Sequence, residues 1–269
     1  MEHTAEGLRK RGPFVARICR VPDSEKEENK MKQMEVWAHR GASGYMPENT
    51  MEAFELAIEQ KADGIELDVQ LSRDGEVMVF HDESVDRVTN SSGLVKDFTS
   101  WQLKEIPVKP VNAPGKIYRI PTLSEVLDLM RHTDMKVNIE LKNSVFFYEG
   151  MEEKVIALVK DLGMKEQIIY SSFNHYSLRK IREIDPGAET GLLMCDGWID
   201  AASYGRKVGV NALHPAVYHL QYPDFVKKCR EQGLKLHVWT ANQPEHFAMV
   251  KAAGADAVIT NYPDKAREF

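Results

Sequence analysis

Short runs rich in β-branched residues alternate with longer amphipathic stretches from Val36 to the end of the chain. This alternation is typical of βα units, in which a helix follows each strand and covers the sheet. The runs predicted to be strands are Val36–His39, Gly64–Leu71, Val137–Leu141, Ile168–Ser172, Thr190–Met194, Ala212–His214, Leu234–Thr240 and Ala257–Thr260. The stretches predicted to be helices include Thr50–Gln60, Leu123–His132, Glu152–Leu162, Tyr176–Ile184, Asp224–Glu231 and Glu245–Ala253. Eight strands in this rhythm predict an α/β fold, either a TIM (β/α)8 barrel or a doubly wound open sheet.

Polar residues mark the places where the predicted strands end. They are His39-Arg40, Glu66 with Asp68, Glu140 with Lys142, Ser171-Ser172-Phe173, His214, Trp239-Thr240 and Thr260-Asn261. In a TIM barrel the catalytic groups lie at the carboxyl ends of the strands and on the loops that follow them. The placement of these residues therefore favours the barrel over the open sheet.

One segment interrupts the alternation. The run Val77–Phe80 ends in His81-Asp82 and leads into Ser-, Gly- and Pro-bearing residues as far as Pro121. Long connections of this kind are often functional. We therefore expect a small inserted segment after the second strand, over residues 82–119, that covers the active face.

The start of the first predicted helix carries a recognisable signal. Asn49 is followed by Glu52 three residues later. A small polar residue with Glu at this spacing is typical of a capping box. We expect Asn49 to cap the helix.

Composition excludes several classes of protein. The net charge of −6 and pI of about 5.9 give no support to a nucleic-acid partner. The three cysteines are widely spaced and form no zinc or disulfide pattern, which indicates a reducing, cytoplasmic location. No apolar run approaches the roughly 20 residues that span a bilayer, so no stable membrane insertion is expected. Residues 1–34 are expected to be a flexible leader, and residues 35–269 the barrel.

Three carboxylates share two predicted strands. Because side chains alternate along a strand, Glu66 and Asp68 lie on one face of their strand, as do Glu140 and Lys142 on theirs. Like charges held close together in a partly dry pocket repel unless a positive charge lies among them. Oxygen ligands without a nearby cysteine predict a hard divalent cation, Mg²⁺ or Ca²⁺. The alternatives are exposed carboxylates on an edge strand and a surface ion pair between Glu140 and Lys142.

Two histidines follow strand-like runs and suit proton transfer near neutral pH. His39 and His81 are candidates for a general acid and base, although a histidine beside a strand is often only a structural hydrogen-bonding group. Arg40 and Lys142 would supply a guanidinium and an ammonium to a phosphoryl oxyanion. Phosphate is therefore the leading ligand.

Several other side chains are candidates for the outer pocket. Trp239, Phe173, Tyr45 and Met194 could line it and contact an alcohol or a quaternary ammonium, or they could serve packing alone. His214 and Asn242 follow later strands, where loop residues could touch the substrate.

The charged segments carry a family resemblance. The run from His39 to Thr50, HRGASGYMPENT, resembles the opening signature of the glycerophosphodiester phosphodiesterases of the bacterial, cytoplasmic type. The likeness continues through Glu66–Val69, Val79–Asp82, Ile120–Leu123, Asn138–Lys142, Ser171–Phe173, Val238–Thr240 and Thr260–Asp264. It covers the chain from Glu35 to Phe269.

The resemblance implies a TIM barrel that hydrolyses glycerophosphodiesters to glycerol 3-phosphate and an alcohol with the help of a divalent metal. It implies that His39 and His81 are the acid/base pair, and that Arg40 and Lys142 bind phosphate. Glu66, Asp68 and Glu140 would hold the metal. The inserted segment would shape the glycerol and head-group end, where Thr89–Gly93 is less glycine-rich than is common in the family.

The resemblance also leaves a related activity open. A barrel phosphodiesterase of the lysophospholipase D or phosphoinositide type would act on lipid substrates and would need access to them. In both cases the expected partner is a small-molecule phosphodiester, and a homo-oligomer is possible.

Overall fold

Eight parallel strands close into a barrel in the computed structural model, which describes residues 34–111 and 115–269. Around the barrel the strands follow the order β1, β9, β8, β7, β6, β5, β4, β2, and pairing of β2 with β1 closes the ring. The barrel strands are β1 Glu35–His39, β2 Gly64–Leu71, β4 Lys136–Leu141, β5 Ile168–Ser172, β6 Glu189–Met194, β7 Ala212–Pro215, β8 Lys235–Val238 and β9 Ala257–Thr260. The predicted TIM barrel is confirmed. The expected leader, apart from Met34, lies outside the described residues.

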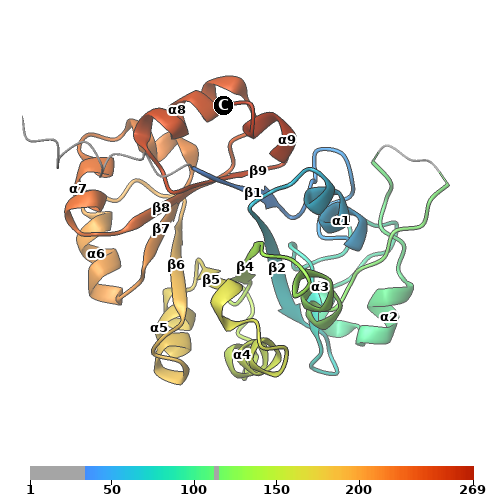
Figure 1. The fold of residues 1–269 in the computed structure, drawn as a ribbon. Helices are drawn as coiled ribbons and strands as arrows, with labels where there is room; N and C mark the ends of the chain where they lie inside the picture. The colour runs from blue at the N-terminus through green and yellow to red at the C-terminus, as the bar shows by residue number, and fades with distance from the viewer. Residues whose placement is uncertain (1–33, 112–114) are drawn as a thin grey trace, which may run out of the picture. The chain divides into compact units, whose positions relative to one another are not determined.

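Helices surround the barrel on its outside, in chain order (Figure 1). The α-helices are α1 Met51–Glu59, α2 Ser100–Glu105, α3 Leu123–Met130, α4 Met151–Asp161, α5 His175–Ile184, α6 Ala201–Val208, α7 Phe225–Glu231, α8 Pro244–Ala253 and α9 Pro263–Ala266. The 3₁₀ helices are η2 Val95–Asp97, η3 Lys165–Gln167 and η4 Val217–Gln221. All six helices expected above are present, whereas α2, α6 and α9 were not expected. Within the described part of the chain, no helix is long and apolar enough to cross a bilayer.

Helix α6 is absent from the expected pattern because a glycine lies inside it. Glycine lowers helix propensity by about 1 kcal/mol relative to alanine, so Gly205 weakens the sequence signal. The structure gives a packing reason for this glycine. A Cβ atom at position 205 would lie 2.8 Å from the Leu213 side chain and 3.3 Å from that of Leu234. The glycine therefore lets the helix approach strand β7 closely.

The expected cap of α1 is wrong by one residue. Thr50, not Asn49, is the N-cap, and its hydroxyl accepts a hydrogen bond from the backbone N–H of Ala53. Asn49 has a left-handed backbone with φ of 57° and points its amide to Asp68, to which it donates a 2.9 Å hydrogen bond. The hydrogen bond from Asn49 to Asp68 therefore takes the place of the helix-capping role that local sequence preference assigns to Asn49.

The inserted segment has a small apolar core of its own. It begins after β3 Val77–Val79, which pairs antiparallel with β2, and it contains η2 and α2. The buried members of this cluster are Met78, Phe80, Val85, Val95, Leu103, Ile106, Val108, Tyr118 and Ile120. The segment is therefore packed as a unit and does not depend only on contacts with the barrel.

The floor of the barrel is filled by rings and small residues. Trp37 packs with its ring centroid 4.5 Å from that of His237, and His237 Nδ1 lies 2.8 Å from His214 Nε2. Both histidines are buried. Position 191 on β6 must be glycine, because a Cβ atom there would lie 2.0 Å from His214 Nε2. His214, one of the candidate substrate contacts, thus belongs to the barrel floor.

We predict that Gly191→Ala destabilises the protein by about 3 kcal/mol, the upper end of the usual range for overpacking, because the buried imidazole cannot move aside. The free energy of unfolding measured by urea denaturation checks this. Gly187→Ala is the matched control, since its nearest neighbour, at 3.2 Å, is the flexible end of Lys165. Equal losses in the two variants would contradict the packing argument.

The His214–His237 contact also predicts a pH dependence. Burial, and then the charge of His237, lowers the pKa of His214 well below 6.5. Below pH 6.5 the unfolded chain takes up a proton that the folded protein does not, so the stability from this group is lost as the pH falls, by about 1.4 kcal/mol per unit. Urea denaturation at pH 7.5 and 5.5 should show a smaller loss in His214→Asn than in the wild type. An identical loss of unfolding free energy in His214→Asn and the wild type would contradict the prediction.

Candidate active site

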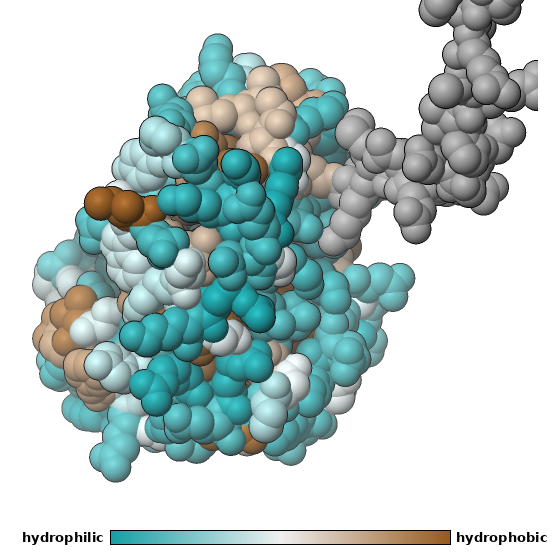
Figure 2. Space-filling model, turned by 90° about the vertical axis from the view of Figure 1, so that its left-hand side faces the viewer, coloured by the Kyte–Doolittle hydropathy of each residue, from teal (hydrophilic) through white to brown (hydrophobic). Residues whose placement is uncertain are grey.

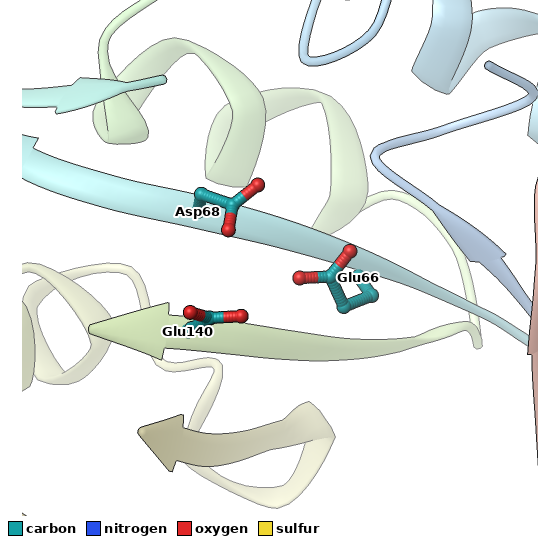
Figure 3. A group of neighbouring side chains, drawn as sticks. All are labelled: Glu66, Asp68 and Glu140. Carbon is teal, nitrogen blue, oxygen red and sulfur yellow. The ribbon is translucent and has the colours of Figure 1, made fainter. Parts of the chain in front are cut away.

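Three buried carboxylates meet on the neighbouring strands β2 and β4. Glu66 and Asp68 extend from β2 and Glu140 from β4, and their oxygens point toward a common space (Figure 3). One oxygen of each residue lies within 4.8 Å of those of the other two. The register of the strands causes this, because Asp68 is paired directly with Glu140. The three residues predicted to hold a metal are thus brought together.

Burial and mutual repulsion perturb the three acids. Burial, followed by the charges of Asp68 and Glu140, raises the pKa of Glu66 well above its ordinary range. Burial and the charge of Asp68 also raise the pKa of Glu140. Burial likewise acts to raise the pKa of Asp68, but the positive groups around it, Arg40 first, lower it below its ordinary value. Glu66 and Glu140 are therefore harder to ionise than ordinary carboxyl groups, whereas Asp68 is easier to ionise.

The donor set fits a hard divalent cation. All three side chains offer oxygen, which Mg²⁺ and Ca²⁺ prefer. Among the described residues, the buried atom Asp68 Oδ1 has no hydrogen-bond partner, and neither has Oδ1 of Asn138, which is paired with Glu66 on the neighbouring strand. Buried polar atoms without a partner are costly, so these oxygens are suited to a ligand.

Arg40 lies between carboxylates. Its backbone N–H donates to Glu66 Oε2 at 3.0 Å, and its guanidinium lies 2.9 Å from Glu48 Oε1 and 3.3 Å from Asp68 Oδ2. The residue has a left-handed backbone, with φ of 56°, which is unusual for a side chain of this size. That conformation directs both its backbone N–H and its side chain toward the acids.

His39 closes β1 and has a neutral partner. Its Nδ1 donates to Asn261 Oδ1 at 2.7 Å, which leaves a lone pair on Nε2, 3.9 Å from Glu66 Oε2. Burial, and then the charge of Arg40, lowers the pKa of His39 to about 4. The imidazole is therefore neutral at pH 7, with its basic nitrogen on the side of the carboxylates.

His81 has a charged partner instead. Its Nδ1 donates to Asp82 Oδ1 at 2.6 Å, and its Nε2 lies 3.3 Å from the ammonium of Lys142. Lys142 also pairs with Glu140 at 3.1 Å. The two histidines thus differ in their electrostatic surroundings, because Nδ1 of His39 faces an amide and Nδ1 of His81 faces a carboxylate.

A buried glutamine holds the loop that carries His81. Gln70, on β2, donates from its amide nitrogen to the backbone carbonyls of Phe80, His81 and Asp82 at 3.1, 3.2 and 2.6 Å. The hydroxyl of Tyr148 donates to the amide oxygen of Gln70 at 3.1 Å. These bonds fix the backbone of the loop, and with it the position of the imidazole.

A cavity of about 370 Å³ opens onto this cluster. Its charged and polar wall consists of His39, Arg40, Glu66, His81, Asn138 and Glu140, and its apolar wall of Phe173, Leu193, Cys195, Trp239 and Ile259. Phe173 and Trp239 meet edge to face with centroids 5.7 Å apart. Two of the three aromatic residues expected there, Phe173 and Trp239, therefore line the cavity. Lys142 and Asp68 are not among its lining residues, although Lys142 contacts His81 and Glu140 in its wall. The described residues of the inserted segment do not line it.

Other candidate contacts lie elsewhere. Tyr45 donates from its hydroxyl to Asp264 at 2.8 Å, and Met194 is buried between the barrel and its helices. Asn242 accepts from the backbone N–H of Asn261 at 2.9 Å and so supports the partner of His39. A larger hollow of about 530 Å³, lined mainly by residues from Gly197 to Ala202 and Tyr222 to Phe225, lies away from the acids and both imidazoles.

Sequence reasoning missed the partners of the site residues. Glu48, Asp82 and Asn261 stand within the segments that resemble the family, but they received no role. Their proximity in sequence to Arg40 and His81 was a signal for the first two. Asn261 lies 222 positions from His39 along the chain, and only the closure of the barrel brings them together.

The sequence and the fold have close counterparts. A protein from Caldanaerobacter subterraneus subsp. tengcongensis named glycerophosphodiester phosphodiesterase is 42% identical over 231 residues, which cover 85% of this chain and 94% of the relative. A Bacillus subtilis protein of the same name is 36% identical over 247 residues, covering 84% and 83%.

The fold is also similar to solved structures of phosphodiesterases. A glycerophosphodiester phosphodiesterase from Agrobacterium tumefaciens superposes with a TM-score of 0.77 at 28% identity, covering 88% of this chain and 100% of its own. An Oleispira antarctica phosphodiesterase in complex with the product sn-glycerol-3-phosphate gives 0.74 at 27% identity, covering 87% and 95%. The model of the glycerophosphoryl diester phosphodiesterase family matches residues 39–265. The chain therefore belongs to the glycerophosphoryl diester phosphodiesterase family.

Proposed function

We propose that this protein hydrolyses glycerophosphodiesters to glycerol 3-phosphate and an alcohol, with a divalent metal and a histidine pair. One observation carries the proposal: Glu66 and Glu140, two of the three clustered carboxylates, line a cavity of about 370 Å³ together with two imidazoles and a guanidinium. The names of the relatives and the sn-glycerol-3-phosphate in the Oleispira antarctica enzyme support the substrate class. The protein is thus a phosphoric diester hydrolase, as its family membership indicates.

In this proposal Glu66, Asp68 and Glu140 hold the metal ion, Mg²⁺ or Ca²⁺. When bound, the ion would neutralise charge on the non-bridging oxygens of the diester. The perturbed pKa values of Glu66 and Glu140 support the assignment, because a bound cation would offset the burial and the repulsion that raise them.

Arg40 and Lys142 supply further positive charge to the phosphate. Arg40 lies in the wall of the cavity and is held by Glu48 and Asp68, so that its guanidinium is oriented before the substrate arrives. Such preorganised charge stabilises a developing oxyanion without reorganisation during the reaction. Lys142 would move from His81 Nε2 toward a phosphoryl oxygen when the substrate enters.

The partners of the two histidines divide the proton transfers between them. His39 donates from Nδ1 to a neutral amide, so its Nε2 is free to accept a proton from the nucleophile. The nucleophile is water or the neighbouring glycerol hydroxyl. His81 donates to the carboxylate of Asp82, which stabilises the imidazolium. His81 is therefore the group that protonates the departing alkoxide.

The partner of the protein is then a small-molecule phosphodiester. The cytoplasmic location expected from the sequence stays a prediction. Rates on glycerophosphocholine and on lysophosphatidylcholine separate the proposed activity from the lipid-directed alternative.

Metal removal tests the carboxylate cluster. We predict that chelation abolishes hydrolysis and that Mg²⁺, Ca²⁺ or Mn²⁺ restores it. Calorimetric titration of the metal alone should show affinity that falls roughly 10- to 100-fold, or more, in Glu66→Gln. Glu152→Gln is the matched control, because Glu152 is a buried carboxylate on α4 that pairs with Lys180 at 3.1 Å, outside the cluster. Unchanged affinity in Glu66→Gln would contradict its role as a ligand.

The leaving group tests the division between the histidines. His39→Ala and His81→Ala should each lower kcat on glycerophosphocholine by roughly 10²–10⁴-fold. A p-nitrophenyl diester of glycerol phosphate has a leaving group that needs no protonation. On that substrate His81→Ala should recover most of its rate, while His39→Ala should remain as slow as before. Steady-state kinetics on both substrates measure these rates. Equal recovery by the two variants would refute the assignment of His81 as the acid and His39 as the base.

A further inference from the structure

A single guanidinium connects the loop after β1 with the loop after β3. Arg87, in the inserted segment, donates to Asp82 from Nε at 2.6 Å and from Nη2 at 3.0 Å. It donates to Glu48 from Nη1 at 2.9 Å and from Nη2 at 2.6 Å. Both carboxylates are thus engaged through both of their oxygens, a geometry that the planar guanidinium permits and an ammonium does not.

Each of these carboxylates also holds a residue of the cavity. Glu48 Oε1 accepts from Arg40 Nη1 at 2.9 Å, and Asp82 Oδ1 accepts from His81 Nδ1 at 2.6 Å. A continuous chain of charged hydrogen bonds therefore runs from Arg40 through Glu48, Arg87 and Asp82 to His81. Arg87 itself is half exposed and does not line the cavity.

The inserted segment holds Arg87 in place. Val85 is fully buried in the apolar cluster of the segment, and Val88 packs against the same cluster. The hydroxyl of Thr89 donates to the carbonyl of Val85 at 2.7 Å, and Lys109 Nζ donates to the carbonyl of Arg87 at 3.2 Å. The backbone on both sides of Arg87 is therefore fixed, and this fixes the position from which the side chain reaches Glu48 and Asp82.

The charges make this guanidinium necessary. Glu48 and Asp82 are acids from separate loops, and without a cation between them they would repel each other. Burial acts to raise the pKa of Asp82, but the hydrogen bonds from Arg87 and then from His81 lower it to about 2. Asp82 is thus kept ionised as the acceptor for the imidazole.

We infer that Arg87 is a positioning residue of the proposed diesterase, which sets the phosphate-binding Arg40 and the proton donor His81 in register with each other through Glu48 and Asp82. The inference rests on the proposed function. It gives the inserted segment a role in catalysis without contact with the substrate. A misplacement of about 1 Å in a reacting group can cost roughly 10²-fold in rate, so the loss of this bridge is measurable.

The test measures kcat and KM for glycerophosphocholine with the metal-loaded full-length protein. Arg87→Ala should lower kcat roughly 10- to 100-fold. Arg87→Lys, which keeps the charge but not the fork, should fall between Arg87→Ala and the wild type. Arg131→Ala is the matched control, because Arg131 is similarly exposed and forms a 2.7 Å surface pair with Asp128 on α3. It should retain the wild-type kinetics.

Rescue separates positioning from folding. Low, non-denaturing concentrations of guanidinium should raise kcat of Arg87→Ala by filling the vacated position, and should leave the wild type and Arg131→Ala unchanged. The double variant Asp82→Asn with Arg87→Ala should lose less than the product of the two single losses, because the residues act as a unit.

The outcomes are distinguishable. A wild-type protein that hydrolyses no glycerophosphodiester refutes the proposed function. An active wild type matched by both Arg87 variants refutes the positioning role. The positioning role is also refuted if the loss of kcat in Arg87→Ala matches the fraction of unfolded protein measured by circular dichroism and guanidinium does not restore activity. If Arg87→Ala does not fold, the kcat of Arg87→Lys provides the test instead.

Discussion

Electrostatic repulsion among three buried carboxylates is the constraint on which the rest of the site depends. Glu66, Asp68 and Glu140 bring oxygens within 4.8 Å of one another, and all three residues are buried. Such a cluster needs positive charge and hydrogen-bond donors close by. The backbone N–H of Arg40 meets Glu66, and the amide of Asn49 meets Asp68. The left-handed backbone of these two donors follows from that need.

The same constraint extends outward through ion pairs. Arg40 and Lys142 are drawn toward the acids, and each is held by a further partner, Glu48 in one case and His81 in the other. Positive and negative groups therefore alternate from the cluster to the surface. A network of this kind orients its members more sharply than isolated pairs do, because each group is fixed from two sides. It also connects loops that follow different strands.

The sequence allowed the barrel and the acids of the site to be predicted because both leave local signals. Strands and helices appear as changes of periodicity, and ionisable residues inside apolar runs, such as Glu66 and Glu140, are conspicuous. Helix α6 was not predicted because Gly205 weakens its helical signal, although the glycine serves packing against Leu213. Asn49 was assigned to a helix cap because local capping rules cannot register a distant partner such as Asp68.

Contacts between residues far apart in the sequence could not be predicted either, because local sequence rules do not register distant partners. Arg87 and Glu48 are 39 positions apart, and no sequence pattern between them indicates that they are in contact. The inserted segment was correctly expected, but its own apolar cluster was not. Its members Val85, Val95 and Leu103 come from a loop, from η2 and from α2, so their spacing matches neither the helical nor the strand period.

The cavity is divided between the two halves of the chain. Its charged wall comes from the region of β1 to β4, and its apolar wall comes from β5 to β9. Substitutions at Phe173, Leu193 or Trp239 thus alter the shape offered to a bound molecule while leaving the acids, the imidazoles and their ion pairs intact. We expect selectivity to diversify among relatives through the second half of the barrel, independently of the reactive groups in the first.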